Sequence, residues 1–321
     1  MRGRRDFILG MPCLLLPAAA VAQAFPTKPV RIVVPFGPGG VGDLTARIVA
    51  QRMEQGLGQP VVIENKPGAG GVVAGETVAK AVPDGHTLLL MSNATAVSAS
   101  LFSNLPFDAR SDFAPVSMLG YFDIALLAPA GGRYRTAAGL IAHARANPGK
   151  LNVGTVNVGS TQNLAAELLK TTAGVEFQVV PFNGSPALLN ALRGGQVDAG
   201  VEMLAPMLGQ VRGGTVLALA VMGEGRAPAL PEVPTLAESG VPGFNVASWN
   251  ALAAPARTPP QVLARLNREV QAALTSPEVV RRLGEINVTP SASTPQQLAT
   301  LLDSETRRWA EVIARAKIPR Q

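Results

Sequence analysis

The stretch "VRIVVPFGPGGVGDLTARIVAQRM", residues 30–53, joins an apolar run to a glycine-rich turn and then to a helical pattern. Residues 30–36 have the composition of a buried strand, and from Asp43 to Leu57 apolar residues recur at helical spacing. A strand that turns directly into a helix is the repeating unit of α/β proteins. The stretch therefore predicts an α/β fold.

The glycines of this turn match G-x-G-x-x-G, and Glu64 ends the next β-type run, where a dinucleotide-binding protein places its ribose-binding acid. The surrounding residues argue against that hypothesis. Asp43 stands at the expected N-cap, where its carboxylate would accept the N–H groups that a pyrophosphate needs. Pro35 and Pro38 remove two further donors. Nucleotide binding is therefore the third hypothesis, after a solute receptor and an enzyme.

Residues 1–24 have the pattern of a signal peptide, with a basic start, an apolar centre and the small residues Ala22 and Ala24 at its end. The apolar part is shorter than the roughly 20 residues that span a bilayer. We expect export to the periplasm, and the pair Arg4-Arg5 leaves the twin-arginine route open. Cys13 is the one cysteine and lies in this segment, so the mature chain is expected to lack thiol chemistry.

Composition narrows the class of ligand. Loss of residues 1–24 removes three arginines and one aspartate, which lowers the net charge from +6 to +4. With two Trp, two Tyr and no basic run interleaved with aromatics, the chain is not expected to bind nucleic acid. A mildly basic surface suits an anionic small molecule.

Beyond residue 25, short β-rich runs alternate with helical stretches, which predicts α/β architecture with mostly parallel sheets. Composition changes at 121–134 and at 223–244, where Pro and Gly crowd together. We interpret these as crossings between two lobes. Lobe 1 is expected to comprise residues 26–124 plus 247–321, and lobe 2 residues 125–246.

Three strand-to-helix turns are the candidate binding elements: residues 36–43, 155–163 and 182–186. Such turns present free N–H groups at the positive end of a helix dipole and so favour anions. Two turns on two lobes could hold the two ends of a dicarboxylate. Gly40 is expected to need positive φ and to leave space for a carboxylate.

Enzymatic chemistry has little support in the sequence. His86 and His143 are unaccompanied by a G-x-S-x-G motif, and the carboxylates show no metal-ligand spacing. We predict no catalytic residue, no metal site and no cofactor. An exported α/β enzyme acting on a small organic acid remains the alternative.

Several segments together resemble the tripartite tricarboxylate transporter substrate-binding proteins, also called Bug receptors. They occur in the expected order over nearly all of the mature chain and include "VPFGPGGVGDLTARIVA", "VIENKPGAGGVVAGETVAKAVPDGHTLLL", "GSTQNLAAELLKTTAGV", "VPFNGSPALLNALRGGQVDAGVE" and "LPEVPTLAESGVPGF".

The resemblance implies a type II-like periplasmic binding protein whose two lobes close on a small di- or tricarboxylate or acidic amino acid. It also implies a monomer that serves membrane transporter subunits or a sensor kinase. Backbone amides of two turns would hold the ligand, with Asp43 ordering its own loop and Asp198 near the cleft. The implied binding residues are Phe36, Gly39, Gly40, Val41, Gly42, Asp43, Ser92, Asn93, Thr155, Asn157, Gly159, Ser160, Thr161, Asn163 and Asp198.

This chain departs from the family pattern at three places. Asn163 stands where most relatives have His, Asn157 replaces a usual glycine, and Phe182-Asn183 replaces Tyr-Lys. The last change removes a hydroxyl and a positive charge beside the second turn. The size and charge of the ligand therefore stay open, and a monocarboxylate or aromatic acid is an alternative.

Overall fold

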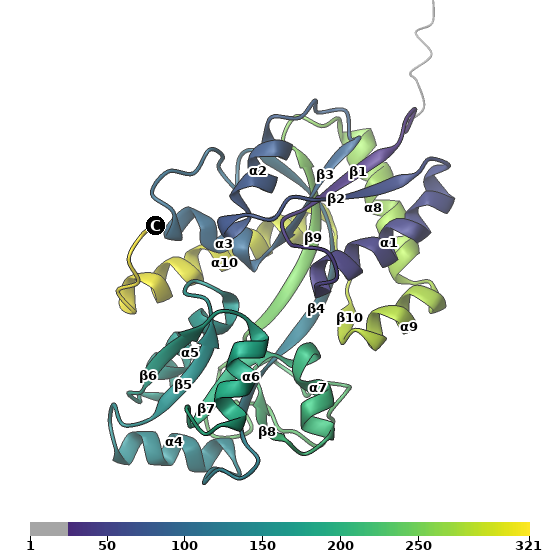
Figure 1. The fold of residues 1–321 in the computed structure, drawn as a ribbon. Coiled ribbons are helices and arrows are strands. Elements are labelled where there is room, and N and C mark those ends of the chain that lie inside the picture. Colours follow the sequence, from purple (N-terminus) through teal and green to yellow (C-terminus); the bar gives the residue numbers. More distant parts are fainter. Residues whose placement is uncertain (1–24) are drawn as a thin grey trace, which may run out of the picture.

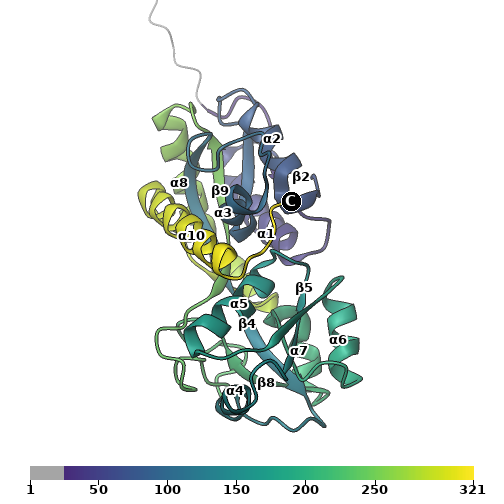
Figure 2. The ribbon, with the colours of Figure 1, turned by 90° about the vertical axis from the view of Figure 1, so that its left-hand side faces the viewer.

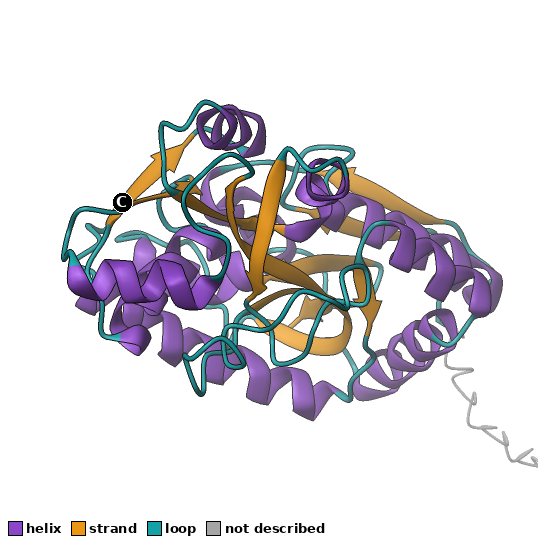
Figure 3. Cartoon of the chain, turned by 90° about the horizontal axis from the view of Figure 1, so that it is seen from below, coloured by secondary structure: helices purple, strands orange, loops and turns teal. Residues whose placement is uncertain are grey.

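The computed structural model describes residues 25–321 and has two lobes connected by two long strands (Figure 1). The predicted signal peptide, with Cys13 and Arg4-Arg5, lies outside the described residues. Both lobes are α/β, and helices surround the strands in each (Figure 3). The α/β prediction is confirmed.

Lobe 1 contains a parallel trio of strands in which β1 lies between β2 and β3. The first half of its chain folds into β1 (Val30–Val34), α1 (Val41–Leu57), β2 (Val61–Asn65), η1 (Ala69–Gly71), α2 (Val72–Ala79), β3 (Thr87–Ser92) and α3 (Asn93–Leu101). The chain returns to this lobe with α8 (Pro260–Leu274), α9 (Pro277–Glu285), β10 (Val288–Pro290) and α10 (Pro295–Arg315).

Lobe 2 repeats the parallel trio, with β5 between β6 and β7. Its elements are α4 (Ala137–Ala146), β5 (Asn152–Val156), α5 (Thr161–Ala173), β6 (Gln178–Phe182), α6 (Ser185–Arg193), β7 (Ala199–Met203), α7 (Leu204–Arg212) and β8 (Val216–Val221). In both lobes the turns after the parallel strands point toward the other lobe (Figure 1).

Two strands, β4 (Phe113–Pro129) and β9 (Ala247–Pro255), connect the lobes. Residues of β4 up to Asp123 pair with β9, and from Ile124 onward they pair with β7 and β8. Because both connecting strands run antiparallel to their neighbours, the sheet is more mixed than the expected mostly parallel one. The lobe boundaries at 124/125 and 246/247, as limits of independently moving units, stay a prediction.

The two crossings expected from composition have different structures. Residues 121–129 belong to the continuous strand β4, most of whose side chains are buried from one lobe into the other. Residues 223–244 instead pack against lobe 2, where Leu236, Val241 and Phe244 are buried in its core. The proline-rich stretch is therefore a packed loop of lobe 2.

Helix α10 runs along lobe 1 and reaches lobe 2 at α5 (Figure 2). Its buried face, which includes Leu298, Leu302 and Trp309, shares one apolar cluster with both lobes. None of the helices among residues 25–321 is long and apolar enough to span a membrane.

Candidate functional site

A cavity of about 720 Å³ lies between the lobes. From lobe 1 it is lined by the start of the turn after β1, the glycine-rich segment before α2, α3 with the residue after it, and Gln321. From lobe 2 it is lined by the turns after β5 and β6. The lining residues are Pro35, Phe36, Gly68, Gly70, Gly71, Ala94, Leu101, Phe102, Asn157, Val158, Gly159, Ser160, Pro181, Phe182, Asn183 and Gln321. None of these side chains is charged, so an anion in the cavity would rely on neutral hydrogen-bond donors.

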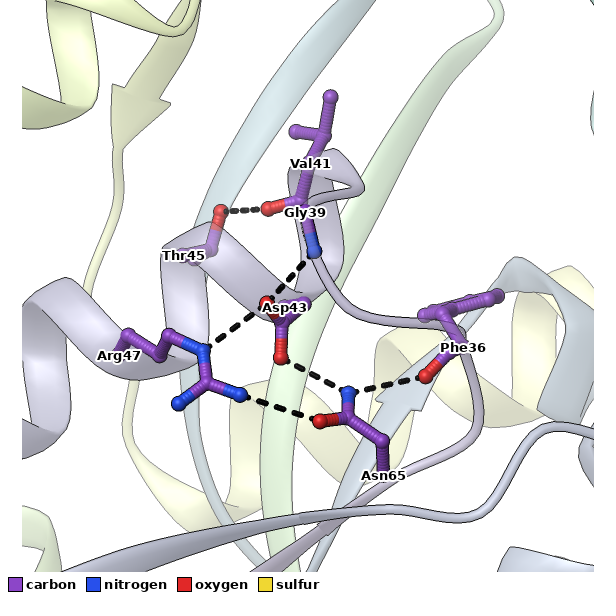
Figure 4. A network of polar contacts seen from close by, with 7 residues as sticks. All are labelled: Phe36, Gly39, Val41, Asp43, Thr45, Arg47 and Asn65. Carbon is purple, nitrogen blue, oxygen red and sulfur yellow. Dashed lines mark hydrogen bonds and ion pairs between the residues drawn. The ribbon is translucent and has the colours of Figure 1, made fainter.

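The turn after β1 is ordered by the buried carboxylate of Asp43 (Figure 4). Its Oδ2 atom accepts hydrogen bonds from the Gly39 N–H at 2.9 Å and from Arg47 Nε at 2.9 Å. Its Oδ1 atom accepts from Asn65 Nδ2 at 2.8 Å, and Asn65 also donates to the Phe36 carbonyl at 2.9 Å. The carboxylate thus joins both ends of the turn to β2.

The prediction that Asp43 is the N-cap of the first helix is wrong. Helix α1 begins at Val41 after Gly40, which offers no side-chain cap, so Asp43 is the third helical residue. Burial acts to raise the pKa of Asp43, but the hydrogen bonds from Arg47, Gly39 and Asn65 lower this pKa below its usual value. The ionised carboxylate therefore stabilises its own loop. The first-turn N–H groups of α1 receive no side-chain cap.

The two features that suggested dinucleotide binding, the glycine-rich turn and Glu64, are both engaged in other contacts. The Gly39 N–H is already bonded to Asp43. Glu64 forms ion pairs with Arg31 at 2.8 Å and Lys66 at 3.2 Å. The expectation of a positive φ at Gly40 is also wrong, because its φ is −74°. The residue of this turn with positive φ is Gly39, at 84°.

The turn after β5 is ordered in the same way by Asn163, which is buried. Asn163 Oδ1 accepts from the Gly159 N–H at 3.1 Å, and Nδ2 donates to Thr155 Oγ1 at 3.2 Å. Ser160 caps α5 by accepting from the Asn163 N–H at 3.1 Å and donates its own proton to the Val156 carbonyl at 2.8 Å. The Asn163 side chain therefore holds the loop.

The two lobes touch across the cavity where Gly159 approaches α3. A Cβ atom on Gly159 would lie 2.5 Å from Leu101 Cδ2, and Gly159 has a φ of +78°. Both the close approach and the backbone angle therefore require glycine at this position.

Four of the predicted binding residues line the cavity: Phe36, Asn157, Gly159 and Ser160. Behind this lining, Val41 and Gly42 begin α1, and Thr161 begins α5. Whether these residues bind a ligand stays a prediction.

Ser92 and Asn93 lie at the start of α3 and are buried. Ser92 Oγ accepts from the Ala94 N–H at 3.2 Å. Asn93 Nδ2 donates to the Ala247 carbonyl at 3.4 Å, which joins α3 to the beginning of β9. The residue of this segment that lines the cavity is Ala94.

The placement of Asp198 near the cleft is wrong. Asp198 immediately precedes β7, and its Oδ2 accepts from the Asn152 N–H at 2.9 Å, at the start of β5. The cavity is at the other end of β5, where the 157–160 turn begins. Because β5 and β7 are parallel, their starting ends share the edge remote from the other lobe.

Phe182, Asn183 and Phe102 line the cavity but were absent from the predicted set. Phe182 and Asn183 belong to the turn 182–186, which the sequence already indicated as a candidate binding element because it joins a strand to a helix. Phe102 carried no such clue, since it follows α3 and reaches the cavity only through the packing of α3.

A buried acid, Glu202, was also missed. Its Oε1 accepts from Gln162 Nε2 at 2.6 Å and from the Met203 N–H at 2.7 Å, while Oε2 has no partner among the described residues. Burial raises the pKa of Glu202. No group of three or more His, Cys, Asp or Glu side chains within residues 25–321 is arranged to hold a metal ion.

Comparisons with known proteins agree with this architecture. The family description "Tripartite tricarboxylate transporter family receptor" matches residues 45–318. Protein BugT of Bordetella pertussis is 36% identical over 298 residues, covering 92% of this chain and 91% of BugT.

Two solved structures have similar folds. A protein of R. palustris with adipate has a TM-score of 0.80 and 34% identity, covering 92% of this chain and 100% of that one. MatC from Rhodopseudomonas palustris with bound malate has a TM-score of 0.76 and 35% identity, covering 90% and 100%. The chain belongs to the tripartite tricarboxylate transporter receptor family.

Proposed function

We propose that the chain is a periplasmic solute receptor that captures a small carboxylate between its two lobes. The observation that carries the proposal is that two strand-to-helix turns, 36–43 and 155–163, contribute lining to one cavity from different lobes: Phe36 from the first turn, and Asn157, Gly159 and Ser160 from the second. Each turn leads into a helix whose first N–H groups lack intrahelical partners, which favours an anion.

The site can select an anion without a cationic side chain. Backbone N–H groups bind a carboxylate through charge-assisted hydrogen bonds, and the helix dipole adds a favourable field. Two related proteins were solved with adipate and with malate, both carboxylates. A role as a receptor requires binding and release of the ligand unchanged, and no residue here is assigned to catalysis.

The family name supports delivery of the ligand to membrane transporter subunits. The alternative is that the ligand-loaded receptor binds a sensor kinase. We propose that the receptor itself acts as a monomer, because both sides of the cavity come from one chain.

Thermal unfolding of the chain lacking residues 1–24 tests the binding function. A ligand that binds only the folded state stabilises it by about 2.7 kcal/mol at 100 times its dissociation constant. We expect stabilisation by at least one member of a panel of mono-, di- and tricarboxylates, and none by NAD or ATP. Stabilisation by nucleotides alone would overturn the proposal.

The enzyme alternative needs a separate measurement. The stabilising acid is incubated with the protein and followed by NMR. An unchanged ligand spectrum supports the receptor, whereas conversion of the acid into a product would favour the exported enzyme.

A further inference from the structure

Three phenylalanine rings surround the cavity, each from a different element. Phe36 follows β1, Phe102 follows α3, and Phe182 ends β6. The first two belong to lobe 1 and the third to lobe 2. The remaining lining is mostly aliphatic or glycine, with Leu101 and Val158 among its larger members. The interior of the cavity is therefore suited to an apolar, flat surface.

Each ring packs over a glycine. A Cβ atom on Gly42 would lie 2.8 Å from Phe36 Cδ2, and one on Gly70 would lie 2.2 Å from Phe102 Cε2. For Gly154 the corresponding distance to Phe182 Cε2 is 3.2 Å. One edge of each ring therefore lies so close to a glycine that a side chain at that glycine would crowd it.

The two turns differ in charge. The first turn of α1 contains the ionised carboxylate of Asp43, which opposes the positive end of that helix dipole. At the corresponding position of α5 stands the neutral Asn163. On charge, the start of α5 is therefore the better position for an anion, although the Asn163 N–H there is already bonded to Ser160 Oγ. The lining supplies no cationic side chain for a second anionic group.

From these observations we infer that the preferred ligand is an aryl monocarboxylate, with its carboxylate at the start of α5 and its ring among Phe36, Phe102 and Phe182. The inference rests on the proposed carboxylate-receptor function. A dicarboxylate would place its second charge against apolar rings, where desolvation is not repaid by an ion pair.

Isothermal titration with benzoate, adipate and benzamide tests the inference. We expect benzoate to bind at least tenfold more tightly than adipate. Adipate binding as tightly as benzoate, or more tightly, would overturn it. Failure of every carboxylate to bind, or equal binding of benzamide and benzoate, would instead overturn the carboxylate-receptor function on which it rests.

Two lysine variants locate the ligand body. Asn183→Lys adds a positive charge to the cavity lining, and Gln178→Lys adds the same charge at the exposed, opposite end of β6. The first should improve adipate relative to benzoate by about fivefold or more, whereas the second should leave the ratio unchanged. Equal effects of the two variants would contradict the proposed position of the ligand.

Phe102→Leu and Phe102→Tyr test the ring surface. We expect the leucine variant to weaken benzoate at least fivefold more than adipate, and the tyrosine variant to restore benzoate binding. Equal weakening of both acids by the leucine variant would show that Phe102 supports the fold of the site without selecting an aromatic ligand.

Discussion

Asp43 and Asn163 occupy corresponding positions in the two lobes, and each accepts a hydrogen bond from the N–H of the glycine four residues before it. Those glycines, Gly39 and Gly159, have φ values of 84° and 78°. The same loop is thus built twice, once with an acid and once with its neutral amide.

The first prediction concerns Asn163→Asp. Thr155 can donate its hydroxyl proton to the new carboxylate, and an acid in the first turn of α5 stabilises the helix by about 0.3–1 kcal/mol. The new charge should nevertheless weaken carboxylate binding by roughly fivefold, about 1 kcal/mol. Isothermal titration checks this, with Asn190→Asp at an exposed position of α6 as the charge control. Equal effects of both variants would refute the local explanation.

The second prediction concerns the stability of the Asp43→Asn variant at neutral and at acidic pH. The pKa of Asp43 is lowered in the folded state. Its contribution to the free energy of unfolding is therefore present above the pKa of the unfolded state and is lost as the pH falls through the pKa of the folded state. The variant should lose about 1.5–3 kcal/mol at pH 7, the range for hydrogen bonds to charged groups. Urea unfolding at pH 7 and pH 3 should show a smaller difference at pH 3. A constant difference would contradict the linkage.

The third prediction compares two glycines with positive φ. Gly174→Ala, at the C-cap of α5, meets no atom within 4 Å and should cost only the left-handed backbone strain, about 1 kcal/mol. Gly159→Ala adds a collision with Leu101 across the cavity and should cost more. Leu101→Ala should recover that excess in a double-mutant cycle. Additive effects of Gly159→Ala and Leu101→Ala on stability would mean that the two lobes are not in contact at these residues.

The fourth prediction concerns Glu202→Gln. A carboxyl group whose pKa is raised on folding gives its full stability below the unfolded pKa and loses it as the pH rises through the folded one. The glutamine variant, which does not ionise, should therefore gain stability relative to the parent chain as the pH rises from about 4 to 8. Thermal unfolding across this range gives the difference, and a pH-independent difference would exclude titration of Glu202.

The fifth prediction uses the two tryptophans of the chain, Trp249 and Trp309. Trp249 is buried on β9, where it pairs with Tyr121 on the other connecting strand. If the lobes close on ligand, the strands that join them must adjust, and Trp249 fluorescence should change. The change should survive in Trp309→Phe and vanish in Trp249→Phe; the reverse result would place the response at α10.

Much of the fold could be predicted from local pattern. The apolar runs that became β1, β5 and β6 and the helical spacing of α1 require only nearest neighbours along the chain, and their order suffices for an α/β class. The antiparallel course of β4 and β9 could not be predicted in this way. Strand direction depends on pairing partners more than 100 residues apart, such as Leu89 with Ala253.

The sequence alone determined the strand-to-helix turns and their glycines, because turn chemistry is local and depends on which residues tolerate positive φ. Tertiary structure decided which turns face one cavity, which end of lobe 2 receives Asp198, and how Phe102 reaches the site beside Phe182. Those facts follow from packing between distant segments, in which apolar burial and close contact across Gly159 bring together residues that no local spacing relates.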